Sequence, residues 1–257
     1  MYWRETRRVE MPDRLKLIVA YDGAGFGGWQ SQSHQNTVQD QLERAFKRVT
    51  GKRVRVHGAG RTDAGVHALA QCAHVDLPNR RLSPTDWPNA LNAFLPPTIR
   101  ILRSRYVSPT FHARFSAKGK IYQYRIWAAA VLPPLEFKRA WHVSTPLDFN
   151  LLEEAATLFV GRHDFAAFAA NRGQLEKSTI RTIHSIHVRH RGSLITIEFN
   201  GDGFLYKMAR LITGALVRCA LAKTDLSKIK AELESGRPIG SRVAAPAEGL
   251  FLIRVIY

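Results

Sequence analysis

The chain has 257 residues, 45% of them hydrophobic, which is enough to bury the core of one large domain or of two small ones. Its 38 Lys and Arg residues against 21 Asp and Glu residues leave a formal net charge of +17, so nucleic acid is the first partner to consider. A membrane surface would call for a polybasic cluster or a basic amphipathic helix, and two cysteines, Cys72 and Cys219, are too few for a disulfide framework or a cysteine-based zinc site.

The first half of the chain is predicted to alternate strands with helices. Residues 1–13 look like an untethered leader without the apolar core of a signal peptide. Asn36 and Thr37, with Gln39 and Asp40 three residues on, predict the capped start of a helix that Gly51 ends. A second helix is predicted from Ser83-Pro84 to Phe94, with Ser83 as the cap. Strands are predicted at residues 15–21, 53–57, 70–77 and 98–107.

The second half repeats the pattern. A strand is predicted at residues 120–128, then a helix from Asp148 to Gly161 with one apolar face. Residues 181–191 and 194–200 predict a hairpin around Gly192-Ser193, followed by a helix from about Phe204 to Ala222 and a final strand at 250–257. Strands that follow one another before the helices favour an α+β fold with mainly antiparallel sheets and helices on one face. We therefore expect two α/β halves, residues 14–110 and 111–257.

Two motifs resemble ligand-binding sites but are not interpreted as such. Gly23, Gly25 and Gly28 satisfy G-x-G-x-x-G after a strand, but the next helix starts only near Thr37, so a pyrophosphate site is not favoured and the glycines are assigned to a bent loop. The spacing of His184, His187 and His190 in a strand points them to alternate faces, so no metal site is expected there.

Unlike these two motifs, the segment from Gly58 to His67, GAGRTDAGVH, is a candidate for a reactive site. Its three glycines let the backbone approach a ligand closely, and between them stand one carboxylate, Asp63, and one guanidinium, Arg61. Such a loop between two strands can present a single reactive group to a substrate. The residues alone leave open a turn in which Asp63 bonds its own backbone and Arg61 is solvated.

Five segments in the same order resemble the TruA family of tRNA pseudouridine synthases, and together they cover essentially the whole chain. They are YDGAGFGGWQ at 21–30, GRTDAGVHA at 60–68, FHARFSAKGKIYQY at 111–124, FLYKMARLITGAL at 204–216 and AEGLFLIRVIY at 247–257. The resemblance implies a homodimer whose chains each form two RRM-like (ferredoxin-like) subdomains around a central basic cleft. It also implies an isomerase, an intramolecular transferase, that converts uridine to pseudouridine at positions 38, 39 and 40 of the tRNA anticodon stem-loop.

The same resemblance implies roles for four residues. Asp63 matches the essential catalytic aspartate, the nucleophile, and Arg61 the neighbour that helps to extrude the target nucleotide. Tyr122 matches the tyrosine that packs against the base, and Arg210 a basic partner of the aspartate. The chain departs from the family at Ile121, where a second basic residue is common, and at Lys207, where His is common, so neither is given a role.

No cofactor and no metal are implied, because the reaction breaks the N1–C1′ bond and rejoins the uracil through C5 without adding or removing an atom. The carboxylate must stay ionised, which an Arg at ion-pair distance favours. Whether Asp63 bonds to the substrate or assists glycal formation stays open at this point. The partner is tRNA, with no membrane and no small-molecule cofactor, and the expected location is the cytoplasm.

Three rival hypotheses remain at this stage. A non-enzymatic RRM-like binding module would suit the basic charge and the aromatic strand IYQYRIW, but it leaves the Asp63 loop without a role. A glycosidase would need a second carboxylate, for which Glu198 is the candidate. A pseudouridine synthase of different target range is not separable by sequence.

Overall fold

A computed structural model describes residues 13–33, 36–77, 82–170, 178–239 and 242–257. The leader expected at residues 1–13 lies outside the described residues except for Asp13, which begins the first strand. The strands are β1 (Asp13–Tyr21), β2 (Val56–Gly58), β3 (His67–Leu77), β4 (Ile99–Val107), β5 (Gly119–Ala128), β6 (Trp141–Val143), β7 (Gly161–Asp164), β8 (Ile180–Arg191), β9 (Leu194–Gly201) and β10 (Leu250–Ile256). The helices are α1 (Val38–Thr50), α2 (Trp87–Asn92), α3 (Phe149–Thr157), α4 (Met208–Ala220) and α5 (Leu226–Ser235).

One mostly antiparallel sheet runs through both halves of the chain. Its order is β4-β1-β3-β10-β5-β9-β8-β7, with β2 added on β3 and β6 on β5. The last strand, β10, pairs in parallel with β3 and antiparallel with β5, so the C-terminus joins the two halves. The predicted α+β class with mainly antiparallel pairing is confirmed.

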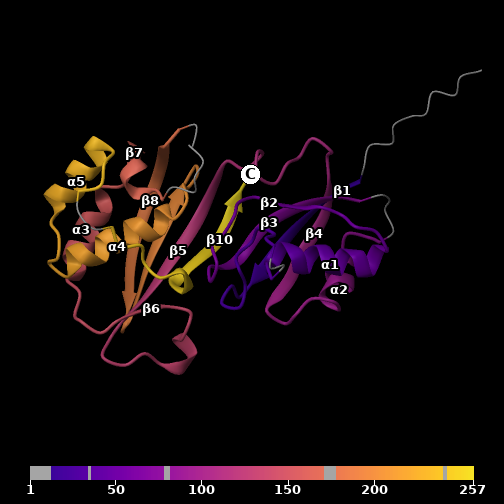
Figure 1. Cartoon of the computed structure of the whole chain (residues 1–257), viewed down its shortest axis with the longest axis horizontal. Coiled ribbons are helices and arrows are strands. Elements are labelled where there is room, and N and C mark those ends of the chain that lie inside the picture. The colour runs from indigo at the N-terminus through magenta and orange to yellow at the C-terminus, as the bar shows by residue number, and fades with distance from the viewer. Residues whose placement is uncertain (1–12, 34–35, 78–81, 171–177, 240–241) are drawn as a thin grey trace, which may run out of the picture.

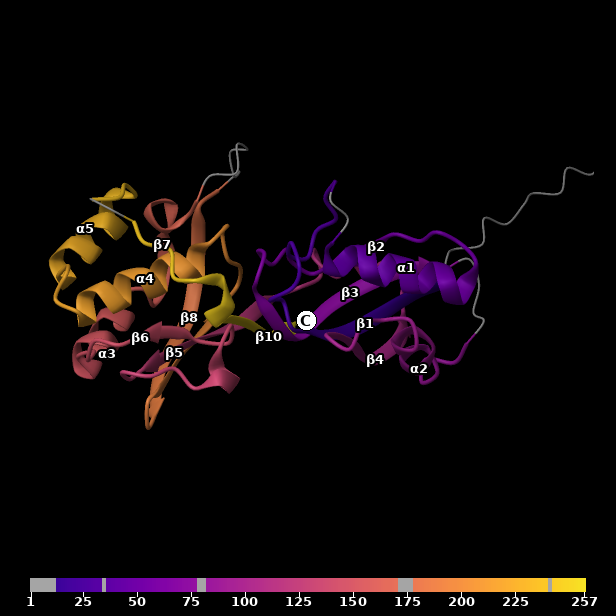
Figure 2. The ribbon, with the colours of Figure 1, turned by 60° about the horizontal axis from the view of Figure 1, so that its bottom comes forward.

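Figure 1 shows how the helices divide along this sheet. The helices α1 and α2 lie beside the strands of the first half, and α3, α4 and α5 lie beside those of the second half, with β10 between the two groups. The turned view keeps the same separation (Figure 2). None of the helices in the described ranges has the length and apolar character needed to cross a bilayer.

Local signals account for the ends of α1. The Thr37 side chain accepts from the Asp40 backbone N–H and the Asp40 side chain accepts from the Thr37 N–H, which completes a capping box. Gly51 ends the helix in the left-handed conformation at φ 72°. The apolar face buries Leu42 and Phe46, and the Phe46 ring lies 5.6 Å from that of Trp87 in α2.

The predicted start of the second helix is wrong. The helix begins at Trp87, and the Ser83 hydroxyl donates to the Asp86 side chain instead of capping the helix. A helix that started at Pro84 would need a backbone N–H at residue 88 to donate to the carbonyl of residue 84, and residue 88 is a proline. The chain therefore turns through residues 84–86 first.

The remaining differences are shorter elements and missed ones. The strand expected from Arg53 begins at Val56, where pairing with Val75 of β3 starts, and the helix expected from about Phe204 begins at Met208. Lys207 precedes that helix in the left-handed conformation at φ 60°, which separates it from the 204–206 segment. The sequence did not predict β6, β7 or α5.

Candidate active site

The Asp63 loop, residues 58–67, connects β2 to β3 and is held at its base by the sheet. The Ala59 N–H donates to the Cys72 carbonyl at 2.8 Å, and the Gln71 side-chain amide donates to the Gly60 carbonyl at 2.9 Å. Farther along, the Thr62 hydroxyl bonds the buried hydroxyl of Tyr21 at 2.8 Å. The loop is therefore fixed on both sides of Arg61.

The glycines of the G-x-G-x-x-G motif allow a second loop to pack against the Asp63 loop. Gly28 has φ +93°, and a Cβ there would lie 2.6 Å from the Thr62 carbonyl oxygen. A Cβ at Gly23 would lie 2.0 Å from the Val66 carbonyl oxygen, so only glycine fits either position. The helix that follows starts at Val38, so the prediction that these glycines lie in a loop well before the helix is confirmed.

Asp63 meets Arg210, which lies 147 residues away in the first turn of α4. The Arg210 Nη1 donates to the Asp63 Oδ2 at 3.0 Å, and the Arg210 Nε donates to the Ala245 carbonyl oxygen at 2.7 Å. The two side chains are 16% and 13% exposed, so the pair is largely shielded from solvent yet open on one side. Two separate contacts orient the guanidinium in front of the carboxylate.

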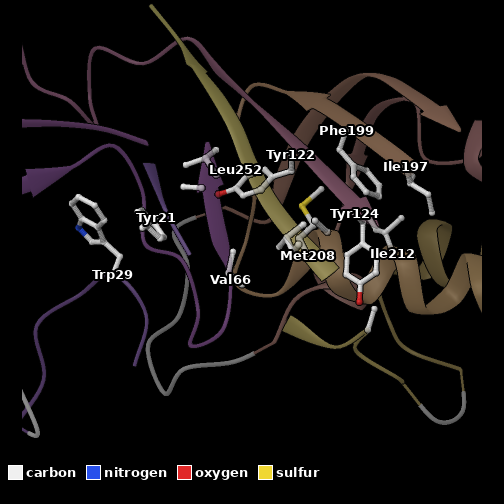
Figure 3. Close-up of a cluster of buried hydrophobic side chains, with 14 of the residues drawn as sticks. Tyr21, Trp29, Val66, Tyr122, Tyr124, Ile197, Phe199, Met208, Ile212 and Leu252 are labelled. Atoms are coloured by element: carbon white, nitrogen blue, oxygen red, sulfur yellow. The ribbon is translucent and has the colours of Figure 1, made fainter. Parts of the chain in front are cut away.

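Tyr122 lies on β5, where it belongs to the apolar core and also lines the same cleft as Asp63 and Arg210. Its side chain is 8% exposed, and its ring meets that of Phe204 edge-on with centroids 5.0 Å apart. Figure 3 shows Tyr122 between Tyr21 on one side and Met208 on the other. Burial, with added effects of Tyr21 and Asp63, raises the pKa of Tyr122, so its hydroxyl stays protonated at neutral pH.

A cleft of about 970 Å³ runs past these residues and is strongly basic. Arg61, exposed at the tip of the Asp63 loop, lines it together with Asp63, Tyr122 and Arg210, so all four residues that the sequence singled out meet in one place. Among the residues that the structure describes, seven Lys or Arg residues line it: Arg55, Arg61, Arg114, Lys120, Arg181, Lys207 and Arg210. Among the described residues that line it, Asp63 is the one carboxylate.

Glu198, the candidate second carboxylate of a glycosidase, is not placed to act with Asp63. It lies on β9 opposite Gln123, whereas the neighbouring pair is Tyr122 and Phe199. Successive residues of a strand point to opposite faces, so Glu198 lies on the face of the sheet away from Tyr122. The described cleft therefore lacks the paired carboxylates that glycoside hydrolysis uses.

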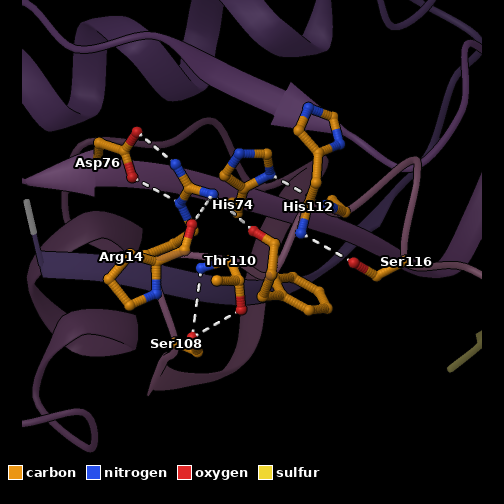
Figure 4. Close-up of polar contacts among 10 residues, drawn as sticks. Arg14, His74, Asp76, Ser108, Thr110, His112 and Ser116 are labelled. Atoms are coloured by element: carbon orange, nitrogen blue, oxygen red, sulfur yellow. Dashed lines mark hydrogen bonds and ion pairs between the residues drawn. The ribbon is translucent and has the colours of Figure 1, made fainter.

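The segment before β5 forms one wall of the cleft and is anchored to β1 by Arg14. The Arg14 guanidinium pairs with Asp76 at 2.7 and 2.8 Å and donates to the carbonyl oxygens of Pro109 and Phe111 at 2.6 and 2.7 Å (Figure 4). The hydrogen bond from Arg14 lowers the pKa of Asp76 below its usual value. This arrangement fixes the start of the wall.

The rest of this wall rests on a buried histidine. The Ala113 N–H donates to the His74 Nδ1 at 3.1 Å, and the His112 N–H donates to the Ser116 hydroxyl oxygen at 3.0 Å (Figure 4). Burial, with the neighbouring His112, lowers the pKa of His74 to about 4, so its ring is neutral at pH 7 and can accept this bond. These bonds fix the turn at residues 112–116, which positions Arg114 in the cleft.

Comparison with known proteins identifies the family of this site. A family model described as tRNA pseudouridine synthase matches residues 17–116 and 155–257, which include the Asp63 loop and α4. The chain belongs to the tRNA pseudouridine synthase family.

Relatives in this family match almost from end to end. The tRNA pseudouridine synthase A of Akkermansia muciniphila is 47% identical over 251 residues, covering 95% of each chain. Those of Methylacidiphilum infernorum and Acetivibrio thermocellus are each 42% identical and cover 94% and 95% of this chain and 94% and 99% of their own. The resemblance seen in five short segments therefore extends over the whole length.

Several residues of the cleft were not singled out by the sequence. Phe204, Arg114 and Arg181 line it, and so does Lys120, which precedes Tyr122 by two positions on β5. Because residues two apart share a face of a strand, the position of Lys120 could have been derived once Tyr122 was assigned to the cleft. The sequence around Arg181 does not indicate that it lines the cleft, because its position there depends on the order of the strands in the sheet.

Proposed function

We propose that this chain isomerises uridine to pseudouridine in tRNA, at positions 38, 39 and 40 of the anticodon stem-loop, with Asp63 as the essential carboxylate. The observation that carries the proposal is that Asp63, the one carboxylate among the described residues that line a basic cleft, lies 3.0 Å from Arg210 in a member of the tRNA pseudouridine synthase family. The reaction needs an ionised carboxylate beside the ribosyl carbon, and a neighbouring guanidinium favours that form.

The chemistry divides among the four residues. Asp63 acts as the nucleophile: its carboxylate oxygen bonds to C1′ as the N1–C1′ bond breaks and the uracil leaves as an anion. After the uracil turns, C5 bonds to C1′ and displaces the carboxylate, which regains its charge; the C5 proton then leaves and N1 gains a proton. Arg210 holds the carboxylate in position. The buried ring of Tyr122 packs against the detached uracil and keeps water from it.

Arg61 completes the site. A base in a folded RNA must leave its stack, at a cost of a few kcal/mol, before Asp63 can reach its sugar. Arg61 is exposed at the loop tip beside Asp63, where its side chain can fill the space that the uridine leaves. The positive charge of the cleft attracts the RNA backbone meanwhile.

The proposal also includes an organisation and a location. We propose two RRM-like subdomains at residues 14–110 and 111–257 around the cleft, a homodimer in which the tRNA contacts both subunits, and a location in the cytoplasm. Light scattering of the purified protein, alone and with tRNA, measures the number of chains in the particle. A particle that contains a single chain in both states would contradict the dimer.

The test of the activity compares wild type with Asp63→Asn on unmodified tRNA, without added metal or cofactor. Asp86→Asn, which removes an exposed carboxylate outside the cleft, is the matched control. We expect carbodiimide-dependent reverse-transcription stops at positions 38–40 with wild type and control, and a loss of at least about a thousandfold in rate with Asp63→Asn. Binding without stops in all three proteins would favour a binding module, and release of free uracil would favour a glycosidase.

A further inference from the structure

Three cations lie near one another in the cleft, and none has a carboxylate partner among the described residues. We call this group, Arg114, Lys120 and Arg181, the cation cluster. Arg114 stacks over the ring of Phe115, with its guanidinium carbon 5.8 Å from the ring centre. Arg181 donates to backbone carbonyls of residues 178 and 180. The cluster therefore carries positive charge that the described protein does not neutralise.

Lys120 is the most constrained member. It shares the cleft-facing side of β5 with Tyr122, and a Cβ at Gly60, at the base of the Asp63 loop, would lie only 2.8 Å from its Nζ. The ammonium makes no hydrogen bond or ion pair within the described part of the chain. Burial and then the charges of Arg114 and Arg181 lower the pKa of Lys120 to about 8.

The described elements packed around Lys120 supply no compensating anion. Its neighbours across the sheet are Gly201 on β9 and Val255 on β10, neither of which carries charge. The carboxylate of Asp202, next to Gly201, accepts the Thr182 N–H at 3.1 Å. A partly buried ammonium that is repelled by its neighbours destabilises the free protein, which suits a group that a bound anion will neutralise.

We propose that the cation cluster binds a phosphodiester of the RNA strand that carries the target uridine, with Lys120 holding that phosphate beside Gly60 at the base of the Asp63 loop. This inference rests on the proposed function, because it names a contact of the same substrate. Three convergent cations fit a phosphate better than they fit a base edge, which offers no charge. The contact sets where the strand lies when its uridine reaches Asp63.

The first test measures binding of unmodified tRNA by wild type, Lys120→Met and Lys118→Met over a range of salt concentrations. Lys118 is an exposed lysine two residues earlier that does not line the cleft, so both variants lose the same charge. We expect Lys120→Met to weaken binding about tenfold, the effect of one charged hydrogen bond. It should also reduce the slope of log affinity against log salt by about 0.7 to 0.9. Equal behaviour of the two variants would overturn the proposal.

The second test is the pH profile of KM. Because the Lys120 ammonium loses its proton as pH rises through about 8, the KM of wild type should rise between pH 7 and pH 9. Lys120→Arg, which stays charged, should show a flatter profile, and that difference separates Lys120 from groups of the RNA that titrate in the same range. Parallel profiles of the two proteins would contradict the assignment.

Stability separates a binding role from a structural one. Lys120→Met removes an unpaired charge, so its thermal unfolding temperature without RNA should equal or exceed that of wild type; a marked fall would indicate a structural residue. Failure of the proposed function is distinguishable, because wild type itself would then form no pseudouridine. Wild-type activity with unchanged KM and salt slope in Lys120→Met would refute this inference alone.

Discussion

Two groups of charged side chains in the cleft differ in how their charges are balanced. Asp63 and Arg210 form an ion pair at 3.0 Å, and the guanidinium is also anchored to the Ala245 carbonyl. The cation cluster has no carboxylate partner among the described residues, and the pKa of Lys120 falls to about 8. The carboxylate proposed to react is thus oriented before substrate arrives, while the surplus of positive charge is left for the substrate to neutralise.

The largest expected effect comes from breaking the ion pair between Asp63 and Arg210. Arg210→Ala removes the guanidinium that orients the Asp63 carboxylate and favours its ionised form. We therefore expect about a hundredfold lower single-turnover rate on tRNA, which corresponds to about 3 kcal/mol of activation free energy. Arg210→Lys should recover only part of it, because an ammonium cannot make both contacts in the geometry of the guanidinium.

The control for this change is Arg218→Ala, on the same helix but outside the cleft. It should keep the wild-type rate. A wild-type rate in Arg210→Ala as well would mean that the ion pair has no part in the reaction.

A smaller effect is expected from moving the Asp63 loop as a whole. Gly28→Ala puts a Cβ 2.6 Å from the Thr62 carbonyl at a backbone angle of φ +93°, and this strain should lower the free energy of unfolding by about 1 to 3 kcal/mol. Gly25→Ala is the matched control, because a Cβ there meets nothing within 4 Å. Urea denaturation of both variants measures the difference, and equal stabilities would show that the close contact is not required.

The smallest effect concerns Arg14, which anchors the segment that carries Arg114 of the cation cluster. Arg14→Met removes the bonds that hold residues 109 and 111, so Arg114 should be less well placed, with KM for tRNA raised about two- to threefold and kcat unchanged. The free energy of unfolding at pH 7 should fall by up to about 1 kcal/mol, since the partner Asp76 is 39% exposed and solvent screens the pair. Arg103→Met, an exposed arginine of β4, is the control.

The difference in the free energy of unfolding between wild type and Arg14→Met should depend on pH, because Asp76 titrates. Its pKa is lower in the folded protein than in the unfolded chain, so the pair stabilises the fold above the ordinary carboxyl pKa and loses this effect as pH falls below about 4. Wild type and Arg14→Met should therefore approach each other in stability in acid. A difference that persists at pH 2 would assign the effect to the backbone contacts of Arg14 instead.

Elements with local signals were predicted well. The capping box of Thr37 and Asp40, the cap at Asp148 and the hairpin at Gly192 are encoded within a few residues, and all three are found. The start of α2 was wrong because the cap signal of Ser83 was given more weight than Pro88, which cannot donate the hydrogen bond that the earlier start requires. The short strands β6 and β7 were missed because three or four residues hold no readable alternation.

By itself, the sequence determined the family, the α+β class and the loop that presents Asp63, because glycine spacing, capping residues and family motifs are written in contiguous residues. Only the tertiary structure decided that β10 joins the two halves, that Arg210 reaches Asp63 across 147 residues and that Glu198 faces the other way. It also decided that Lys120 lies against Gly60 with no partner among the described residues. These facts depend on the order and register of the strands. Long-range pairing sets that order, and no short stretch of sequence contains it.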